Sequence, residues 1–192
     1  MNLVRCRWCN RNNPIYVTYH DTEWGVPQHD DRKLFELLIL ESFQAGLSWE
    51  TVLNKRENFR AAFDGFDPNK IQNYDHAKVL SLMNDPAIIR NRRKIEAAIL
   101  NARVFLEIQH EWGSFDAYLC HFTGLAPIYE IDQVTSPLSD SISVDLRKRG
   151  MRFVGSTIIY SYLQAVGRIY SHDQNCFLFS NLISEIEEPT YG

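Results

Sequence analysis

A glutamate inside a long apolar stretch is the residue whose setting points most directly to chemistry. Glu41 lies within residues 34–53, LFELLILESFQAGLSWETVL, and shares a helical face with leucines and an alanine. A buried carboxylate costs on the order of several kcal/mol unless a partner balances its charge or it stays protonated. Two interpretations follow. A neighbouring arginine or the backbone satisfies Glu41, or Glu41 is the floor of a pocket with the Gly46–Leu47 turn and Trp49 at its rim.

Cysteine and histidine residues near both ends of the chain have spacings typical of metal ligands. His172 and Cys176 are separated by three residues, and Cys6 and His20 lie near the N-terminus. Together they form a Cys2His2 set, which structural zinc prefers. Cys9 is an alternative ligand, because two residues separate it from Cys6. The N-terminal sequence has no apolar segment typical of a secretory signal, so the four cysteines indicate a reducing, cytoplasmic setting in which metal ligation is favoured over disulfides.

Two glycines, Gly150 and Gly155, bracket a tight turn that is followed by a new helix from Ser156. The first N–H groups of that helix and its dipole are suited to binding an anion. Residues 144–168 hold five basic residues and one acidic residue, and residues 90–103 have the same balance, although the whole chain has a net charge of −4. Two basic patches in an acidic chain indicate phosphate binding by one surface, with two solvated helix faces as the alternative.

The elements that must position these residues are predicted to be helices. Helices are expected to begin at Asp30 or Asp31, Ser48, Asp67, His76, Asp85, Ser114 and Ser143, with a tight break at residues 45–47 and another near residues 90–93. Residues 5–27 and 123–140 are expected to be irregular, and the acidic tail at 184–192 to be disordered. No run alternates as a strand does, and no apolar run is long enough to span a membrane. The sequence therefore predicts an all-α protein of one domain.

Seven sequence blocks, spread over about residues 5–176, occur in the order found in a known family. They are Cys6-x-Trp8, residues 19–27 (YHDTEWGVP), residues 40–49 (LExxQAGLSW), residues 51–56 (TVLxKR), residues 88–95 (IIRxRxKI), residues 148–155 (KRGxxFVG) and His172-x3-Cys176. On these blocks the chain resembles bacterial 3-methyladenine DNA glycosylase I, a branch of the helix-hairpin-helix glycosylase superfamily. The resemblance implies a single glycosylase domain over residues 1–192, with a helical body at about 28–167 and a zinc-pinned subdomain formed by about 1–27 and 168–183.

The resemblance also implies roles for individual residues. One structural zinc ion is expected on Cys6, His20, His172 and Cys176. A base pocket is expected to contain Glu41, Tyr16, Tyr19 and Trp49, with Trp8 and Trp24 close by. DNA contacts are expected at Gly46, Leu47, Gly150, Arg152, Gly155 and Ser156.

The implied reaction is the removal of 3-methyladenine from double-stranded alkylated DNA in base excision repair. The enzyme is expected to flip the damaged base out of the helix and to hydrolyse its N-glycosidic bond, which releases the free base and leaves an abasic site. Because N3-alkylation makes adenine cationic, aromatic faces and a carboxylate suit it, and Glu41 is expected to accept hydrogen bonds from the base. No lysine is placed to attack the sugar, so we expect a monofunctional, monomeric enzyme without lyase activity.

Two other classes of protein stay open at this point. A helix-hairpin-helix module that binds DNA without catalysis would need the hairpin and the basic patches, but not Glu41 among aromatic residues. A zinc hydrolase acting on a small molecule would need an open coordination position on the metal instead of four protein ligands. The range of alkylated bases accepted is not determined by the sequence.

Overall fold

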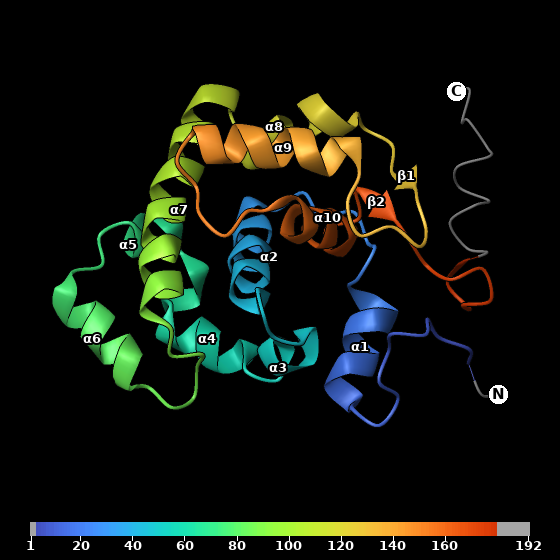
Figure 1. Cartoon of the computed structure of the whole chain (residues 1–192), viewed down its shortest axis with the longest axis horizontal. Coiled ribbons are helices and arrows are strands. Elements are labelled where there is room, and N and C mark those ends of the chain that lie inside the picture. The colour runs from blue at the N-terminus through green and yellow to red at the C-terminus, as the bar shows by residue number, and fades with distance from the viewer. Residues whose placement is uncertain (1–2, 180–192) are drawn as a thin grey trace.

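The structure, a computed structural model that describes residues 3–179, is built mainly of α-helices (Figure 1). The helices are α1 Pro14–Thr22, α2 Asp31–Gln44, α3 Trp49–Leu53, α4 Arg56–Ala62, α5 Pro68–Ile71, α6 His76–Asn84, α7 Arg92–Trp112, α8 Phe115–Thr123, α9 Pro137–Lys148 and α10 Ser156–Ala165, with a 3-10 helix, η1, at Asp64–Phe66. Two short strands, β1 Ile128–Tyr129 and β2 Ile169–Tyr170, pair in parallel. The predicted helical architecture is confirmed, and the strict all-α prediction is corrected by this one strand pair.

Helix α2 is the centre of the fold, with α3, α7, α8 and α10 packed around it (Figure 1). It begins where the Asp30 side chain accepts a hydrogen bond from the backbone N–H of Lys33. Every residue from Leu34 to Phe43 is buried, as expected for a helix that is apolar on all sides. This helix therefore carries Glu41 into the core.

Residues 5–27 contain a helix that the sequence analysis does not predict. Helix α1 begins at Pro14, and the Asn13 side chain accepts hydrogen bonds from the N–H groups of Ile15 and Tyr16. Proline is favourable at the first position of a helix, because the N–H group it lacks would have had no helical partner there. The prediction of an irregular segment is wrong for residues 14–22, where Pro14 starts a helix instead of breaking one, and is confirmed for the rest of the segment.

The predicted loop at 123–140 is also shorter than expected. Helix α9 begins at Pro137, and Ser136 and Ser139 form a reciprocal capping box before it. The strand pair matches Ile128 with Ile169, and two residues carry too little alternation to be recognised in a sequence. The helix predicted from Ser48 is divided into α3 and α4, and the long helix predicted from Asp85 begins only at Arg92.

Segments from the two ends of the chain lie side by side (Figure 1). The backbone N–H of Phe177 donates to the carbonyl of Val4 at 2.8 Å, and the backbone N–H of Arg7 donates to the Asp173 carboxylate at 2.7 Å. The division into a helical body and a terminal subdomain stays a prediction. Residues 180–183 of that subdomain and the acidic tail lie outside the described residues.

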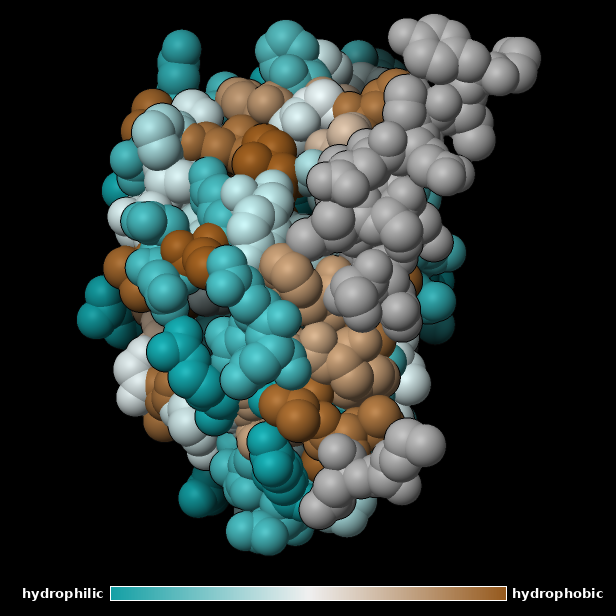
Figure 2. All heavy atoms as spheres, turned by 90° about the vertical axis from the view of Figure 1, so that its right-hand side faces the viewer, coloured by the Kyte–Doolittle hydropathy of each residue, from teal (hydrophilic) through white to brown (hydrophobic). Residues whose placement is uncertain are grey.

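The face that forms the right-hand side of Figure 1 mixes hydrophilic residues with hydrophobic patches (Figure 2). In the loop between α8 and α9, Leu125 and Val134 are exposed, and single exposed apolar side chains are ordinary on protein surfaces. Over residues 3–179, no helix combines the length and the apolar character needed to cross a membrane.

Candidate active site

Glu41 is a buried acid without a partner among the described residues. Its side chain lies in the core of the fold, 3% exposed, and no described group is within hydrogen-bond distance of its Oε2 atom. Burial raises the pKa of Glu41 to about 8, because the charged form loses its hydration. The buried Arg56 on α4 pairs with Glu23 and Glu36 instead. The described contacts therefore favour the pocket interpretation over a structural ion pair.

A cavity of about 340 Å³ opens over Glu41. It lies between the N-terminal segment, α1, the end of α2, α3 and α10. All six residues for which the sequence predicts a base pocket contribute to its lining: Trp8, Tyr16, Tyr19, Trp24, Glu41 and Trp49. Segments that are far apart in the sequence thus meet at one site.

The aromatic side chains of the cavity pack against one another, Trp8 edge to face with Trp24 and Tyr16, and Tyr19 at a tilt to Trp49. The ring of Trp8 is centred 4.7 Å from that of Trp24 and 5.5 Å from that of Tyr16, and the rings of Tyr19 and Trp49 are 5.4 Å apart. Within the described chain, the indole Nε1 of Trp49 also has no hydrogen-bond partner. Aromatic surfaces with a buried, unpartnered carboxylate and a free donor suit a flat, positively charged ligand that can form hydrogen bonds at its edge.

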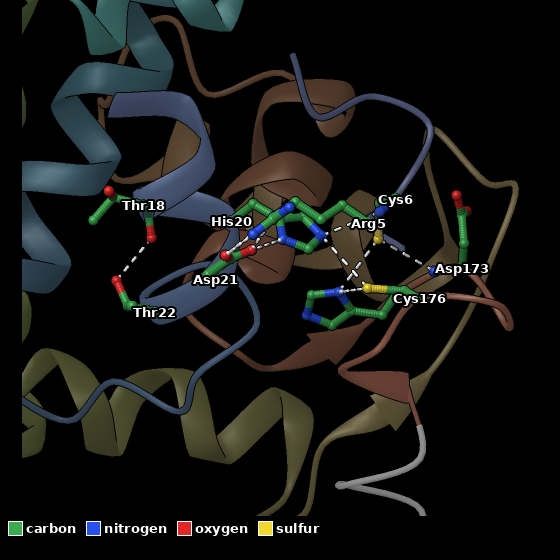
Figure 3. Close-up of polar contacts among 9 residues, drawn as sticks. Arg5, Cys6, Thr18, His20, Asp21, Thr22, Asp173 and Cys176 are labelled. Atoms are coloured by element: carbon green, nitrogen blue, oxygen red, sulfur yellow. Dashed lines mark hydrogen bonds and ion pairs between the residues drawn. The ribbon is translucent and has the colours of Figure 1, made fainter. Parts of the chain in front are cut away.

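The four predicted metal ligands form one buried cluster (Figure 3). The ligand atoms of Cys6, His20, His172 and Cys176 all lie within 4.8 Å of one another. The Nδ1 atom of His172 is 3.3 Å from Cys6 Sγ and 3.6 Å from Cys176 Sγ, and His20 Nε2 is 3.6 Å from Cys176 Sγ. Normal Zn–S and Zn–N bonds in a tetrahedron separate such ligands by roughly 3.6 Å, so the cluster fits zinc. Cys9, the alternative ligand, is buried outside this group.

A second layer of contacts orients the cluster (Figure 3). His20 Nδ1 is 2.7 Å from the carboxylate of Asp21, and Arg5 donates to that carboxylate at 2.6 Å. A carboxylate on the outer nitrogen is a common way to fix a metal-binding histidine, since it leaves Nε2 to face the metal. Burial raises the pKa of Cys6 to about 12, so a cation is needed to hold the thiolate form at neutral pH.

The cluster of cysteine and histidine residues stands directly behind the aromatic wall of the cavity. The ring of Trp24 is centred 4.7 Å from that of His172, and the ring of Trp8 is 5.2 Å from that of His20. Gly25 permits this approach: its φ is +81°, and a Cβ atom there would lie 3.1 Å from His172 Nε2. Fixing the cluster therefore also fixes the aromatic wall.

The predicted hairpin joins α9 to α10, and two buried side chains hold its turn. Asn101 on α7 accepts a hydrogen bond from Arg152 N–H at 2.8 Å and donates to the Arg152 carbonyl at 2.9 Å. Ser143 donates to the carbonyl of Val154 at 2.7 Å. Helix α10 begins at Ser156 without a side-chain cap, so its first N–H groups remain available to an anion.

Basic residues from both predicted patches meet beside this hairpin. Arg93 from α7 lines a second cavity, of about 570 Å³, together with Arg147, Arg152 and Gly155 from the hairpin region. One acid, Glu96, also contributes to the lining. The structure thus brings the two basic stretches together on one surface, as the sequence analysis expects.

The turn after α2, here called the wedge turn, comprises residues 44–47. Its central residues, Ala45 (φ −45°, ψ 113°) and Gly46 (φ +80°), have type II geometry, and Leu47 N–H donates to the Gln44 carbonyl. The positive φ suits glycine. Leu47 is 42% exposed, and Gln44 and Trp49 on either side of the turn line the cavity. An apolar side chain therefore projects at the rim of the cavity.

Several residues of the site were not predicted. The further polar residues that line the cavity are Arg7, Gln44, Asp132, Gln133, Ser161, Gln164, Ser171 and Asp173. Ser161 and Gln164 lie three positions apart on α10, and this spacing is a signal that the sequence contained. Asp21 follows the predicted ligand His20 directly in the sequence, so it could have been predicted as well. Nothing in the sequence marks Asn101, whose partner is 51 residues away.

Comparisons with known proteins agree with this arrangement. A family model described as methyladenine glycosylase matches residues 8–179. DNA-3-methyladenine glycosylase 1 of Escherichia coli is 45% identical over 181 residues, which cover 91% of this chain and 96% of the relative. A crystal structure of 3-methyladenine DNA glycosylase I superposes with a TM-score of 0.87 at 44% identity, covering 91% and 98% of the two chains. A tyrosine-to-phenylalanine variant of 3-methyladenine DNA glycosylase I, in complex with 3-methyladenine, gives 0.86 at 32% identity, covering 90% and 96%.

Proposed function

Because the chain belongs to the methyladenine glycosylase family, we propose that it removes 3-methyladenine from alkylated double-stranded DNA. The reaction is hydrolysis of the N-glycosidic bond, which yields the free base and an abasic site. The observation that carries this proposal is the unpartnered Glu41 in a cavity walled by tryptophan and tyrosine. Such a cavity suits a cationic base, because aromatic faces attract a cation and a carboxylate accepts hydrogen bonds from its edge.

The protonation of Glu41 is coupled to the charge of the base. Burial holds the pKa of Glu41 at about 8, so the side chain is mostly neutral at pH 7 in the free enzyme. A cationic base in the cavity stabilises the carboxylate and lowers that pKa. Binding then releases a proton to solvent, and the affinity for the damaged nucleotide rises with pH until about pH 8. A neutral adenine supplies no such compensation and is bound less well.

The chemical step needs little help from an acid. The electron pair of the C–N bond moves to the base, which leaves as a neutral molecule, while water adds to the sugar carbon and gives its proton to solvent. Glu41 acts by binding the base, and a role as an obligatory general base is not required. Among the described residues, no lysine lines the cavity. A Schiff base with the sugar is therefore not expected, and the enzyme is monofunctional.

Access to the base requires that the nucleotide leave the DNA stack. The exposed Leu47 is suited to fill the gap, because it projects from a short turn beside the cavity. The hairpin is suited to anchor the backbone, since the N–H groups at the start of α10 and the nearby Arg152 offer donors to a phosphate. Neither contact reads a base, so specificity comes from the cavity.

A zinc ion on Cys6, His20, His172 and Cys176 would have a structural role. Four protein ligands leave no open position for water or substrate, and this disfavours a zinc hydrolase acting on a small molecule. When bound, the metal supplies folding free energy by joining the two ends of the chain. A DNA-binding module without catalysis is disfavoured as well, because it would not need an unpaired acid inside an aromatic cavity.

The proposed function is tested by incubating the protein with dimethyl sulfate-treated duplex DNA and identifying the released bases by chromatography. Free 3-methyladenine should appear, and the DNA strand should break only after alkaline treatment of its abasic sites. Zinc content and thermal unfolding are measured on the same sample. A folded, zinc-loaded protein that releases no alkylated base would overturn the proposal.

A further inference from the structure

Lys94 is a buried cation whose described partners are backbone carbonyl groups. It is 6% exposed, and its Nζ atom donates to the carbonyls of Phe43 at 2.7 Å and Ala45 at 2.6 Å. Over residues 3–179, no carboxylate forms an ion pair with it. Burial lowers its pKa. A desolvated ammonium held by dipoles alone is costly, so its position needs an explanation.

The helix on which Lys94 lies does not explain it. Lys94 is in the first turn of α7, where the Asn91 side chain caps its backbone N–H. The N-terminus of a helix carries a partial positive charge and favours acidic side chains over basic ones. The ammonium group instead stabilises the C-terminal end of α2, whose last carbonyls have no partner within their own helix and face Lys94.

One of the two carbonyls that Lys94 binds, that of Ala45, belongs to the wedge turn, and the other, that of Phe43, directly precedes the turn. A type II turn differs from a type I turn by a flip of its central peptide group, which here joins Ala45 to Gly46. The carbonyl of that peptide is the Ala45 oxygen, and Lys94 holds it at 2.6 Å. Lys94 thereby selects the type II form and with it the direction in which Leu47 projects.

Lys94 also lies between the wedge turn and the hairpin. Its Nζ atom is 6.0 Å from the ring centre of Phe153. Phe153 has a φ of +55° and directly follows Arg152, whose backbone is held by Asn101. Lys94 and Asn101 are seven positions apart on α7, which is two helical turns, so they share one face. Helix α7 therefore connects the two predicted DNA contacts through two buried side chains.

From these contacts we propose that Lys94 is a positioning residue that presets the wedge turn for base flipping. The inference rests on the proposed role of Leu47. In the absence of the ammonium group, the peptide between Ala45 and Gly46 is free to flip, and Leu47 no longer enters the DNA stack in register with the cavity. The base pocket itself, which Lys94 does not line, keeps its affinity for the free base.

Lys94→Met tests the proposal, with Lys55→Met as the matched control. Lys55 also donates to two backbone carbonyls, those of Pro86 and Ala87, away from the wedge turn. In Lys94→Met, single-turnover release of 3-methyladenine from duplex DNA should fall roughly 10- to 100-fold, as expected for a misplaced reacting group. The affinity for free 3-methyladenine, followed by tryptophan fluorescence, should stay unchanged. Lys55→Met should change neither quantity.

A double-mutant cycle with Leu47→Ala separates the outcomes. If Lys94 acts through the wedge, Lys94→Met has little further effect in the Leu47→Ala background. Additive losses, or excision by Lys94→Met at the wild-type rate, overturn the role of Lys94 but leave the wedge intact. Wild-type excision by Leu47→Ala overturns the wedge and this inference, whereas release of 3-methyladenine by the wild type tests the proposed function separately. Lys94→Gln keeps one buried donor and covers the case in which Lys94→Met does not fold: it should show the same pattern more weakly, and unchanged excision by it counts against the proposal.

Discussion

Two glutamates on helix α2 are buried to a similar degree, but only one of them has ion-pair partners. Glu36 and Glu41 are 6% and 3% exposed. The Glu36 carboxylate accepts hydrogen bonds from Arg56 at 2.5 Å and Arg60 at 2.9 Å, and Arg56 in turn donates to Glu23. Glu41 has no ion-pair partner among residues 3–179 and faces an open cavity. Burial alone therefore does not distinguish the two acids, and the absence of a described partner is what supports the proposed role of Glu41.

The largest effect is expected at the cluster formed by Cys6, His20, His172 and Cys176, whose ligand atoms face one another as the groups around Glu36 do. We expect Cys176→Ala to lose zinc and about 5 kcal/mol of unfolding free energy, because loss of a structural metal is among the largest single-residue effects. Cys9→Ala, outside the cluster, should retain both. Metal analysis and thermal unfolding check this, and an unchanged transition in Cys176→Ala would contradict a structural site.

The next largest loss of stability is expected from removing a partner of Glu36. Arg56→Met leaves Glu23 without its partner and Glu36 with Arg60 alone, and it should cost about 3 kcal/mol of stability, as breaking a buried ion pair does. Urea unfolding measures the loss. Excision per folded molecule should be nearly unchanged, because Arg56 does not line the cavity. If Arg56→Met were as stable as the wild type but impaired in excision, the group around Glu36 would have a functional role and not a structural one.

Glu41 itself should behave in the opposite way. Its folded pKa of about 8 lies above the ordinary value, so the folded state binds the proton more tightly and the acid costs stability as pH rises from about 4.5 to 8. Glu41→Gln should therefore be more stable than the wild type by about 3 kcal/mol at pH 7, with no gain near pH 4. Unfolding curves at both pH values check the sign. A loss of stability at pH 7 would mean that Glu41, like Glu36, has a structural partner.

An exposed charge should have the smallest effect on the fold. Arg152→Glu should leave the unfolding transition within error, because the backbone of Arg152 supplies the contacts to Asn101. Its affinity for damaged and undamaged duplexes should fall by about the same factor, and the salt dependence of binding should flatten by about one phosphate contact. Filter binding at several salt concentrations measures this. Binding that is unaffected would place the DNA on another face.

The fold was predictable where single residues gave clear local signals. Asp30 and Ser48 cap α2 and α3 as predicted, and the glycine at position 46 marks the wedge turn. Pro14 was misjudged because proline stops a helix in most positions and starts one in the first. The strand pair was not predictable, since the register of Ile128 with Ile169 depends on contacts between distant segments.

The site was predictable in its residue types but not in its connections. The cavity contains all six residues that the family resemblance implies for the base pocket. Local patterns cannot show which acid on α2 is paired, since the arginines that bind Glu36 lie 20 and 24 residues away. The same limit hides Lys94 and Asn101, whose partners are about 50 residues distant.

The central claim, that Glu41 binds the damaged base and has no structural partner, is tested most directly by excision with Glu41→Gln. We measure single-turnover release of 3-methyladenine from duplex DNA, together with affinity for undamaged duplex and the unfolding transition. The account predicts a folded variant with unchanged duplex affinity and excision reduced roughly 100-fold, as for the loss of one polar contact to the reacting group. Excision at the wild-type rate by the folded variant would contradict it.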